Sequence, residues 1–352
     1  MMIKVKLGNK LISKKSSPYI IAEIGVNHEC SMKKAKKLIY LAKKGGADAA
    51  KFQTYKAHLI TSKNAKSYWD TTKEKTKTQF DLFKKYDSFE KKHYLELSKY
   101  CKKLNIEFIS TPFDIESVDM LDSLMKFYKV SSSDITNFPL LEKIASKKKP
   151  VLLSTGASTL NEIKEALNFL VKNKCKNIVI LHCILNYPTK DRDANLNMIS
   201  SLESNFPNHI IGYSDHTLPS KDMTNLTTAY LLGARVIEKH FTINKKKIGN
   251  DHYHSMDFRD LKTFKTKIKK LHLIIGDKKK TYLNSEKNSR KFARRSIVAR
   301  NFIKKNDLIK LGDLICKRPG TGLEPKKINL IVGKKAKRDL MEDQIIFKKD
   351  IK

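Results

Sequence analysis

The chain has 352 residues, 40% of them hydrophobic, which is enough for one large domain or for a large domain and a small one. Its 72 Lys and Arg residues against 36 Asp and Glu give a formal net charge of +36 at pH 7, a balance that raises nucleic acids and anionic membrane surfaces as partners. Because the lysines are spread over almost every segment, we expect anionic substrates and no nucleic-acid or membrane partner, with a polyanion-binding protein as the remote alternative.

The first segment with a strand pattern is a short hairpin. Val5 and Leu7 alternate with lysines, and Leu11 resumes the apolar pattern after the turn residues Gly8 and Asn9. Alternation on both sides of a glycine-containing turn predicts two antiparallel strands.

Eight short runs rich in Ile, Val, Phe and Ala follow the hairpin. Most are separated by charged stretches with helical spacing, such as residues 31–46, in which the apolar residues fall on one face. Strands that alternate with helices pair in parallel through right-handed crossovers. Eight units in about 250 residues predict a (β/α)₈ (TIM) barrel of α/β class. The alternative is a doubly wound open sheet, whose first strand usually ends in a glycine-rich turn; here the first strand ends in "AEIGVNH". The eight runs are 19–25, 47–54, 107–113, 127–133, 150–156, 177–183, 209–215 and 234–240.

A polar, charged stretch separates the barrel from a smaller C-terminal part. We expect a barrel domain at 1–276, a linker at 277–291 and a second domain at 292–352. Residues 299–314 and 336–351 share an apolar pattern at an offset of 37 positions. Two copies suit a small, pseudo-symmetric, β-rich module, which at that size has a marginal core of its own and leans on another surface.

The cysteines and the apolar runs predict the compartment. The five cysteines are dispersed, odd in number and without a Cys-x-x-Cys pair, which argues for a reducing environment and against a structural zinc site. No apolar run approaches the ~20 residues of a membrane span. Residues 1–18 are basic without an apolar core, so we expect no secretory signal and a cytoplasmic protein.

Almost every predicted barrel strand ends on a polar side chain, and the carboxyl ends of the strands are where barrels of this class carry their active sites. Lys51 and Lys129 would supply positive charge there, and hydroxyl groups from several strands would supply directed donors for a compact anion with phosphate or carboxylate oxygens. The alternative for either lysine alone is that its ammonium extends to the rim. The hydroxyl side chains are those of Thr111, Ser132, Ser154 and Ser214.

Two histidines end adjacent strands. His216 and His240 would lie about 4.8 Å apart in strand spacing, which suits two imidazoles that share one divalent ion; a single strand-end histidine is more often a hydrogen-bonded core residue. Glu23 and Asp251 are the candidate acid–base carboxylates. His252 and His254 have metal-like spacing but lie in a predicted loop, so they are weaker candidates.

Taken together, nine segments in order resemble the sialic acid synthase family over nearly the whole chain. The resemblance implies a TIM barrel followed by a C-terminal antifreeze-like (SAF) domain, in a domain-swapped homodimer. It also implies the condensation of phosphoenolpyruvate with an N-acylated hexosamine such as N-acetylmannosamine, with release of phosphate. The segments are "AEIGVNHEC", "KFQT", "STPFD", "YKVSSSDITNFPL", "LSTGAS", "LHCILNYPT", "GYSDHT", "EKHFT" and "KRPGTG".

The resemblance also assigns roles to residues. His216 and His240 would bind a divalent metal, Mn²⁺ with Mg²⁺ or Co²⁺ as alternatives, which would polarise the sugar aldehyde. Glu23 would act as a base or orient water, with His240 and Asp251 also in catalytic positions. The phosphoenolpyruvate positions are Lys51, Thr111, Lys129, Ser132, Ser154 and Ser214. The sugar positions are Gln53, Asp134, Asn186, Tyr187, Asp251, Phe292 and, from the partner subunit, Arg318.

Two departures from the family pattern concern the sugar. Asp134 stands where several members carry Glu, and Asn186 stands one position later than the asparagine of some relatives. Synthases of N-acetylneuraminate, legionaminate and pseudaminate therefore stay open as alternatives. A phosphoenolpyruvate-dependent barrel of the family making eight-carbon ulosonic acids is a further one, although it needs neither "KRPGTG" nor the C-terminal repeat. A sugar-binding module with an inactive barrel is disfavoured by the intact strand ends.

Overall fold

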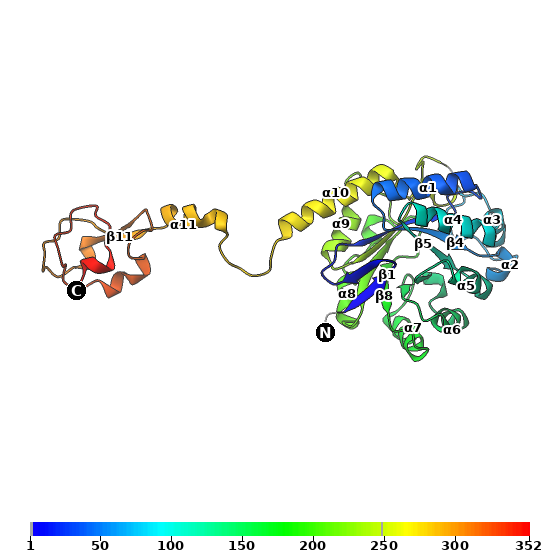
Figure 1. Ribbon diagram of the computed structural model, residues 1–352, viewed down its shortest axis with the longest axis horizontal. Coiled ribbons are helices and arrows are strands. Elements are labelled where there is room, and N and C mark those ends of the chain that lie inside the picture. Colours follow the sequence, from blue (N-terminus) through cyan, green and yellow to red (C-terminus); the bar gives the residue numbers. More distant parts are fainter. Residues whose placement is uncertain (1–2, 248) are drawn as a thin grey trace. The chain divides into compact units, whose positions relative to one another are not determined.

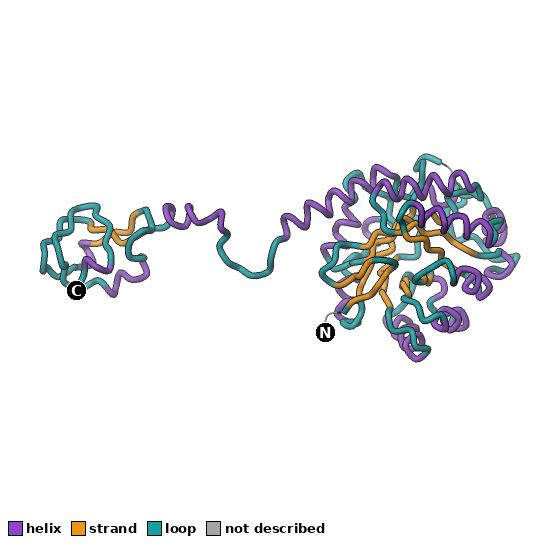
Figure 2. The backbone as a smooth tube through the Cα atoms, in the orientation of Figure 1, coloured by secondary structure: helices purple, strands orange, loops and turns teal. Residues whose placement is uncertain are grey.

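The computed structural model describes residues 3–247 and 249–352, and the chain divides into two compact units, Met1–Ile275 and Gly276–Lys352. The first unit is a barrel of parallel strands surrounded by helices (Figures 1 and 2). Its eight-stranded sheet has the order β5-β4-β3-β10-β9-β8-β7-β6. The two end strands, β5 and β6, lie side by side, so the sheet is nearly closed. The predicted barrel is confirmed, and the open doubly wound sheet is wrong.

All eight predicted strands form. Each is buried along almost its whole length, as expected for parallel strands covered by helices on the outside and by packed side chains within. They are β3 (Tyr19–Gly25), β4 (Ala49–Thr54), β5 (Glu107–Pro112), β6 (Tyr128–Val130), β7 (Val151–Ser154), β8 (Ile178–Cys183), β9 (Ile210–Asp215) and β10 (Val236–His240).

Helices connect and cover these strands. The helix α1 shows why the sequence folds this way: Ser31 caps its first turn by accepting from the backbone N–H of Lys34, and Gly46 ends it with a φ of 96°. The barrel helices are α1 (Met32–Gly45), α2 (Ala57–Ile60), α3 (Gln79–Tyr86), α4 (Lys91–Lys103), α5 (Ile115–Asp122), α6 (Phe138–Ser146), α7 (Leu160–Lys172), α8 (Met198–Asn205), α9 (Thr224–Leu231) and α10 (Phe258–Ile275).

The predicted N-terminal hairpin consists of β1 (Lys4–Leu7) and β2 (Lys10–Ser13), paired antiparallel. It packs at the amino-terminal ends of the barrel strands, where Lys10 pairs with Asp48 and Lys126 Nζ donates to Asn9 Oδ1 over 3.1 Å. The hairpin therefore lies at the end of the barrel away from the predicted site.

The second unit begins with residues that have no regular structure, followed by η4 (Asn284–Glu286) and the short helix α11 (Lys287–Ala293), so part of the predicted linker is helical. Two strands, β11 (Ser296–Ala299) and β12 (Leu314–Lys317), pair antiparallel. Isolated bridges and a small core that includes Ile303 and Leu340 complete this unit.

The 37-residue offset seen in the sequence is a real internal symmetry of the second unit. Ile303 and Leu340, which match at this offset, donate to each other's carbonyl oxygens over 2.9 Å. Equivalent short helices occur at η5 (Leu311–Asp313) and η7 (Lys348–Asp350). In each, the aspartate accepts from the backbone N–H of the residue before the helix. The repeat therefore pairs with itself around a local two-fold axis.

None of the helices in residues 3–247 and 249–352 is both long and apolar enough to cross a membrane.

Candidate active site

Polar side chains from several barrel strands meet at the carboxyl ends of those strands and line a small inner pocket. The alternation of strand side chains decides which residues face it. Ser214 lines the pocket from β9, His216 lines it from the position directly after that strand, and Glu238 and His240 line it from β10. The lining also contains Glu23, Lys51, Gln53, Thr111, Lys129, Ser132, Ser154 and Tyr187.

Asp215 and Lys239, which alternate with these lining residues, do not line the pocket. Lys239 Nζ lies 2.7 Å from Asp215 Oδ2, and both side chains are about 1% exposed. Asp215 also accepts from the hydroxyl of Tyr213 and from the backbone N–H of Thr217. This buried ion pair fixes the ends of β9 and β10, and with them the two strand-end histidines.

Two lysines and two glutamates form the floor of the inner pocket. Lys51 Nζ lies 2.7 Å from Glu23 Oε2 and donates to Thr111 Oγ1 over 3.0 Å. Glu238 Oε1 lies 3.7 Å from Lys51 Nζ and 3.6 Å from Lys129 Nζ, and it accepts from Ser214 Oγ over 3.0 Å. The floor thus pairs two ammonium groups with two carboxyl groups.

Burial changes the proton affinity of these groups. It raises the pKa of Glu23 to about 7, assisted by the charge of Glu238 and opposed by Lys51. Burial lowers the pKa of Lys129. For Lys51 burial acts in the same direction, but Glu23 and Glu238 outweigh it and leave the pKa raised. The pocket therefore contains a carboxyl group that titrates near neutral pH.

Two hydroxyl groups of the pocket, those of Ser132 and Ser154, differ in their hydrogen bonds to the protein. Ser132 Oγ accepts from the backbone N–H of Gly156 over 2.9 Å, which leaves its proton available to a ligand. Ser154 Oγ is buried and has no hydrogen-bond partner among the described residues. A buried polar atom without a partner indicates a position that a ligand or water satisfies.

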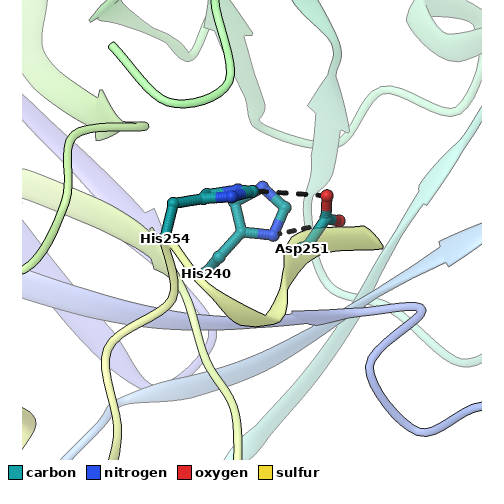
Figure 3. Close-up of side chains that lie close together, drawn as sticks. All are labelled: His240, Asp251 and His254. Carbon is teal, nitrogen blue, oxygen red and sulfur yellow. Dashed lines mark ion pairs between the residues drawn. The ribbon is translucent and has the colours of Figure 1, made fainter. Parts of the chain in front are cut away.

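A second group of side chains joins His240, at the end of β10, to Asp251 and His254 in the segment that follows this strand. Figure 3 shows His240, Asp251 and His254 with the carboxylate facing both rings. His240 Nδ1 lies 3.3 Å from Asp251 Oδ2, and His254 Nε2 lies 3.9 Å from Asp251 Oδ1. Within the described residues, His240 Nδ1 and both nitrogens of His254 have no hydrogen-bond partner. Burial raises the pKa of Asp251 to about 6 and lowers those of both histidines.

The two predicted metal ligands have a geometry compatible with one ion. An imidazole that binds a metal at about 2.1 Å places its ring centre about 3.2 Å from it, so two such rings can lie up to about 6.4 Å apart. The ring centres of His216 and His240 are 5.5 Å apart. His216 Nδ1 lies 2.8 Å from the carbonyl oxygen of Ile184, to which it donates, so Nε2 stays free for a ligand. The residues therefore fit a divalent cation, and His240, Asp251 and His254 offer ligand atoms within 4.8 Å of one another.

An outer cavity of about 560 Å³ opens above the inner pocket and shares Gln53, Tyr187 and His240 with it. Asp134 and Asp251 also line it, and Gln53 Nε2 donates to Glu23 Oε1 over 3.2 Å across the boundary. One wall comes from the segment between β4 and α3, which contributes aromatic and aliphatic side chains. Thus the sugar-side residues predicted within the barrel, except Asn186, meet in one cavity.

Three predicted sugar-site residues are not brought together with the others. Asn186 is exposed and lines neither cavity. Phe292 and Arg318 lie in the second unit and are exposed there, so their part in the site stays a prediction.

Two residues in the site were missed or undervalued in the sequence. Glu238 was visible as a strand-end carboxylate, yet its place between both lysines could not be seen without the barrel's closure. His254 is only a weak candidate in the sequence because it lies in a predicted loop, but it is 1% exposed and lies against His240. His252, by contrast, is held by Thr242 and Glu29, which supports a structural role.

Comparison with known proteins agrees with this geometry. Residues 38–280 match the NeuB family and residues 294–352 match the SAF domain. The chain is 41% identical to N,N'-diacetyllegionaminic acid synthase of Campylobacter jejuni, over 93% of this chain and 98% of that one. It is 33% identical to N-acetylneuraminate-9-phosphate synthase of Drosophila melanogaster, over 96% and 98%.

Among solved structures, an N-acetylneuraminic acid synthetase of Leptospira borgpetersenii in complex with citrate is similar. It aligns with a TM-score of 0.72 at 32% identity, over 82% of this chain and 95% of that one. With a family match over most of the barrel and curated relatives above 30% identity along nearly the full length, the chain belongs to the NeuB family of nonulosonic acid synthases and carries a C-terminal SAF domain.

Proposed function

We propose that this protein condenses phosphoenolpyruvate with an N-acylated hexosamine to form a nonulosonic acid, with release of phosphate. The observation that carries the proposal is the inner pocket, where Lys51 and Lys129 lie next to a larger cavity. The test is phosphate release from phosphoenolpyruvate with N-acetylmannosamine and two di-N-acylated hexosamines, each with and without manganese. No release with any of them would overturn the proposal.

Phosphoenolpyruvate binding would rearrange the floor of the inner pocket. The pocket has a volume of about 40 Å³, room for only a few water molecules at the ~10–15 Å³ that one needs. Room for the substrate requires Lys51 and Lys129 to exchange part of their contact with Glu23 and Glu238 for the ligand's oxygens. Lysine is suited to this exchange because its ammonium donates in three rotatable directions. Ser132, Ser154 and Thr111 would add directed donors.

The reaction joins C3 of phosphoenolpyruvate to the aldehyde carbon of the open-chain sugar. The aldehyde C=O becomes a hydroxyl group, water adds to C2, and the C2–O bond to phosphate breaks as C2 becomes a ketone carbon. The two protons of the water end on the new hydroxyl group and on the released phosphate. Tyr187 and Gln53 would hold the sugar over the inner pocket, and Glu23 would orient the water and take its proton. His216 and His240 would hold a divalent cation, proposed to be Mn²⁺, which when bound supplies a Lewis acid for the aldehyde oxygen.

The role of Glu23 predicts a pH dependence. If the carboxylate form is the active one, kcat/KM should rise about tenfold per pH unit below a pKa near 7 and level off above it, because kcat/KM reports ionisation in the free enzyme. Glu23→Gln should lower kcat by about 10²- to 10³-fold without loss of phosphoenolpyruvate binding. Steady-state kinetics from pH 5.5 to 8.5, beside a binding titration over the same range, separates Glu23 from the ionisation of the ligand. A flat profile below pH 7 would contradict the role.

The second unit is proposed to complete the site of a partner subunit in a domain-swapped homodimer. Arg318 is exposed on a unit with a small core of its own, and a guanidinium suits an acyl carbonyl oxygen.

This proposal predicts complementation. Chains with Arg318→Ala and His216→Ala should each be inactive, and mixing them under subunit exchange should restore a fraction of wild-type activity, because one site in each hybrid keeps both residues. The hybrids are verified by co-purification through two different tags. Hybrids that form yet remain inactive would show that Arg318 does not act across subunits.

A second candidate substrate is a sugar with two N-acyl groups. Two relatives named as N,N'-diacetyllegionaminic acid synthases are 41% and 40% identical to the chain, compared with 33% for the N-acetylneuraminate-9-phosphate synthase of Drosophila.

The chain's free cysteines agree with action in the cytoplasm.

A further inference from the structure

Asn27 joins the turn after β3 to both ends of the segment that follows β10. Its side chain is buried, with 4% of the residue exposed. Asn27 Nδ2 donates to the carbonyl oxygen of Phe241 and to Oγ of Ser255, each over 3.1 Å. These two partners directly follow His240 and His254 in the chain. One amide group therefore links three segments that meet at the candidate active site.

The chemistry of the two ends fixes the direction of this hydrogen-bond chain. The hydroxyl of Ser255 donates its single proton to the carbonyl oxygen of Asp251 over 2.5 Å, and a carbonyl oxygen can only accept. Ser255 Oγ must therefore accept from Asn27, whose second amide proton goes to the carbonyl oxygen of Phe241. Among the described residues Asn27 Oδ1 has no partner, so the side chain is held through its two donated bonds. The position thus requires two protons on one atom, as an amide provides.

His240 is held in place by other bonds as well, whereas Asp251 depends on this chain. The pairing of β10 with β3 extends to His240, and the carbonyl oxygen of His240 accepts from the backbone N–H of Met256 over 2.8 Å. Asp251 lies outside the sheet, in the short helix η3 (Asn250–His252). Loss of the bonds from Asn27 should therefore displace Asp251 more than His240.

The carboxylate of Asp251 has little space in which to move without changing its contacts. Its Oδ2 lies 3.3 Å from His240 Nδ1, and a methyl group on Gly25, at the end of β3, would stand 3.6 Å from the same oxygen. Asp251 also lines the outer cavity. Because a displacement of about 1 Å at a reacting group can cost about 100-fold in rate, the bonds that hold Asp251 bear on the reaction.

From this arrangement we infer that Asn27 is a positioning residue for the reaction, and that through Ser255 it holds the carboxylate of Asp251 beside His240. The inference rests on the proposed function, with Asp251 as a candidate acid–base group. Asn27 itself lines neither the inner pocket nor the outer cavity, so we expect it to contact no substrate. Its effect on the reaction should pass through Asp251.

Two variants break the chain at different points. Asn27→Asp keeps the shape of the side chain but removes both amide protons, and Ser255→Ala removes the link to Asp251 while the bond to Phe241 remains. Each should lower kcat for phosphate release by about 10- to 100-fold. The KM for phosphoenolpyruvate and the affinity for Mn²⁺ should each change by less than about threefold, because His240 keeps its other bonds. Should Asn27→Asp fail to fold, Ser255→Ala carries the same test.

A double-variant cycle tests the path through Asp251. Asp251→Asn should lower kcat by itself, and the addition of Asn27→Asp should lower it no further, because residues that act through one group have non-additive effects. Additive losses, or an unchanged kcat in Ser255→Ala, would overturn the proposal. A loss of Mn²⁺ affinity as large as the loss of kcat would also overturn it, since the effect would then pass through His240.

Hydrogen exchange gives a readout that does not depend on activity. In Asn27→Asp and Ser255→Ala, the backbone amides of residues 249–256 should exchange at least about tenfold faster, while those of β3 and β10 change little. The matched control, Asn173→Asp, loses a bond of the same kind, from Nδ2 to the carbonyl oxygen of Phe169 over 2.9 Å at the end of α7, and should change neither kcat nor exchange in 249–256. Unchanged exchange in Ser255→Ala would overturn the proposal. If the wild type releases no phosphate with any sugar, the proposed function fails, and the exchange rates still decide whether Asn27 holds Asp251.

Discussion

Replacing Lys129 by Met is expected to lower kcat/KM for phosphoenolpyruvate by about 10²- to 10³-fold, the usual effect of removing one member of a buried charge pair at a binding site. Lys129 is 4% exposed, and Glu238 is the carboxylate closest to it, at 3.6 Å. The buried ammonium group of Lys129 is therefore available to an anion inside the pocket, and it does not pair with a carboxylate on the surface. The KM for the hexosamine should change little, because Lys129 lines only the inner pocket.

A control distinguishes two roles of Lys129, binding of the anion and neutralisation of Glu238. Lys129→Met leaves Glu238 with Lys51 alone, which should also lower the melting temperature. The double variant Lys129→Met/Glu238→Gln removes both charges and should regain stability without regaining phosphoenolpyruvate binding. Lys126→Met, an exposed lysine that pairs with Glu107 at the other end of the barrel, should behave like the wild type. Recovery of binding in the double variant would mean that Lys129 serves only to neutralise Glu238.

The barrel could be predicted from the sequence because each strand is both apolar and bounded. Strands such as β3 (19–25) and β8 (178–183) are buried at every position, so their sequences lack the alternation of half-exposed strands and indicate parallel strands. Their polar ends then locate the site, since all carboxyl ends of a parallel barrel meet on one face. For this reason Lys51, Lys129, Ser214 and His216 were found without any knowledge of the three-dimensional structure.

The pairing of those residues could not be predicted in the same way. Glu238 contacts Lys129, although β10 and β6 are not neighbours in the sheet. Such contacts across the barrel depend on its radius and on the rotamers of long side chains, which strand patterns do not encode. His254 was undervalued for a related reason: loop residues take their burial from the surrounding structure rather than from a local period.

The wall of the outer cavity also could not be predicted from the sequence. The segment between β4 and α3 has little regular structure, and Trp69 is positioned by a bond from Nε1 to the backbone carbonyl of Glu74. A polar, lysine-rich segment of this kind predicts only a loop. Its contribution of both carboxylates and apolar side chains to a cavity follows from tertiary contacts.

Removal of either strand-end histidine is expected to abolish metal-dependent turnover while leaving the barrel folded. His216→Ala and His240→Ala should each weaken Mn²⁺ binding by at least about 100-fold, because a site with two protein imidazoles loses half of its nitrogen ligands. Mn²⁺ affinity is measured directly by electron paramagnetic resonance after chelation and return of the ion, so the readout does not depend on activity. Far-ultraviolet circular dichroism verifies the fold.

His254 decides how many protein side chains take part. His254 Nε2 lies 3.9 Å from Asp251 Oδ1, and its ring centre is 4.9 Å from that of His240, close enough for one ion to reach both. The proposal of two histidine ligands predicts that His254→Ala changes Mn²⁺ affinity by less than about threefold, as should His58→Ala, an exposed histidine used as the control. A loss with His254→Ala as large as that with His240→Ala would move the ion to the His240, Asp251 and His254 group. Near-normal Mn²⁺ affinity and turnover in both His216→Ala and His240→Ala would remove the proposed metal site altogether.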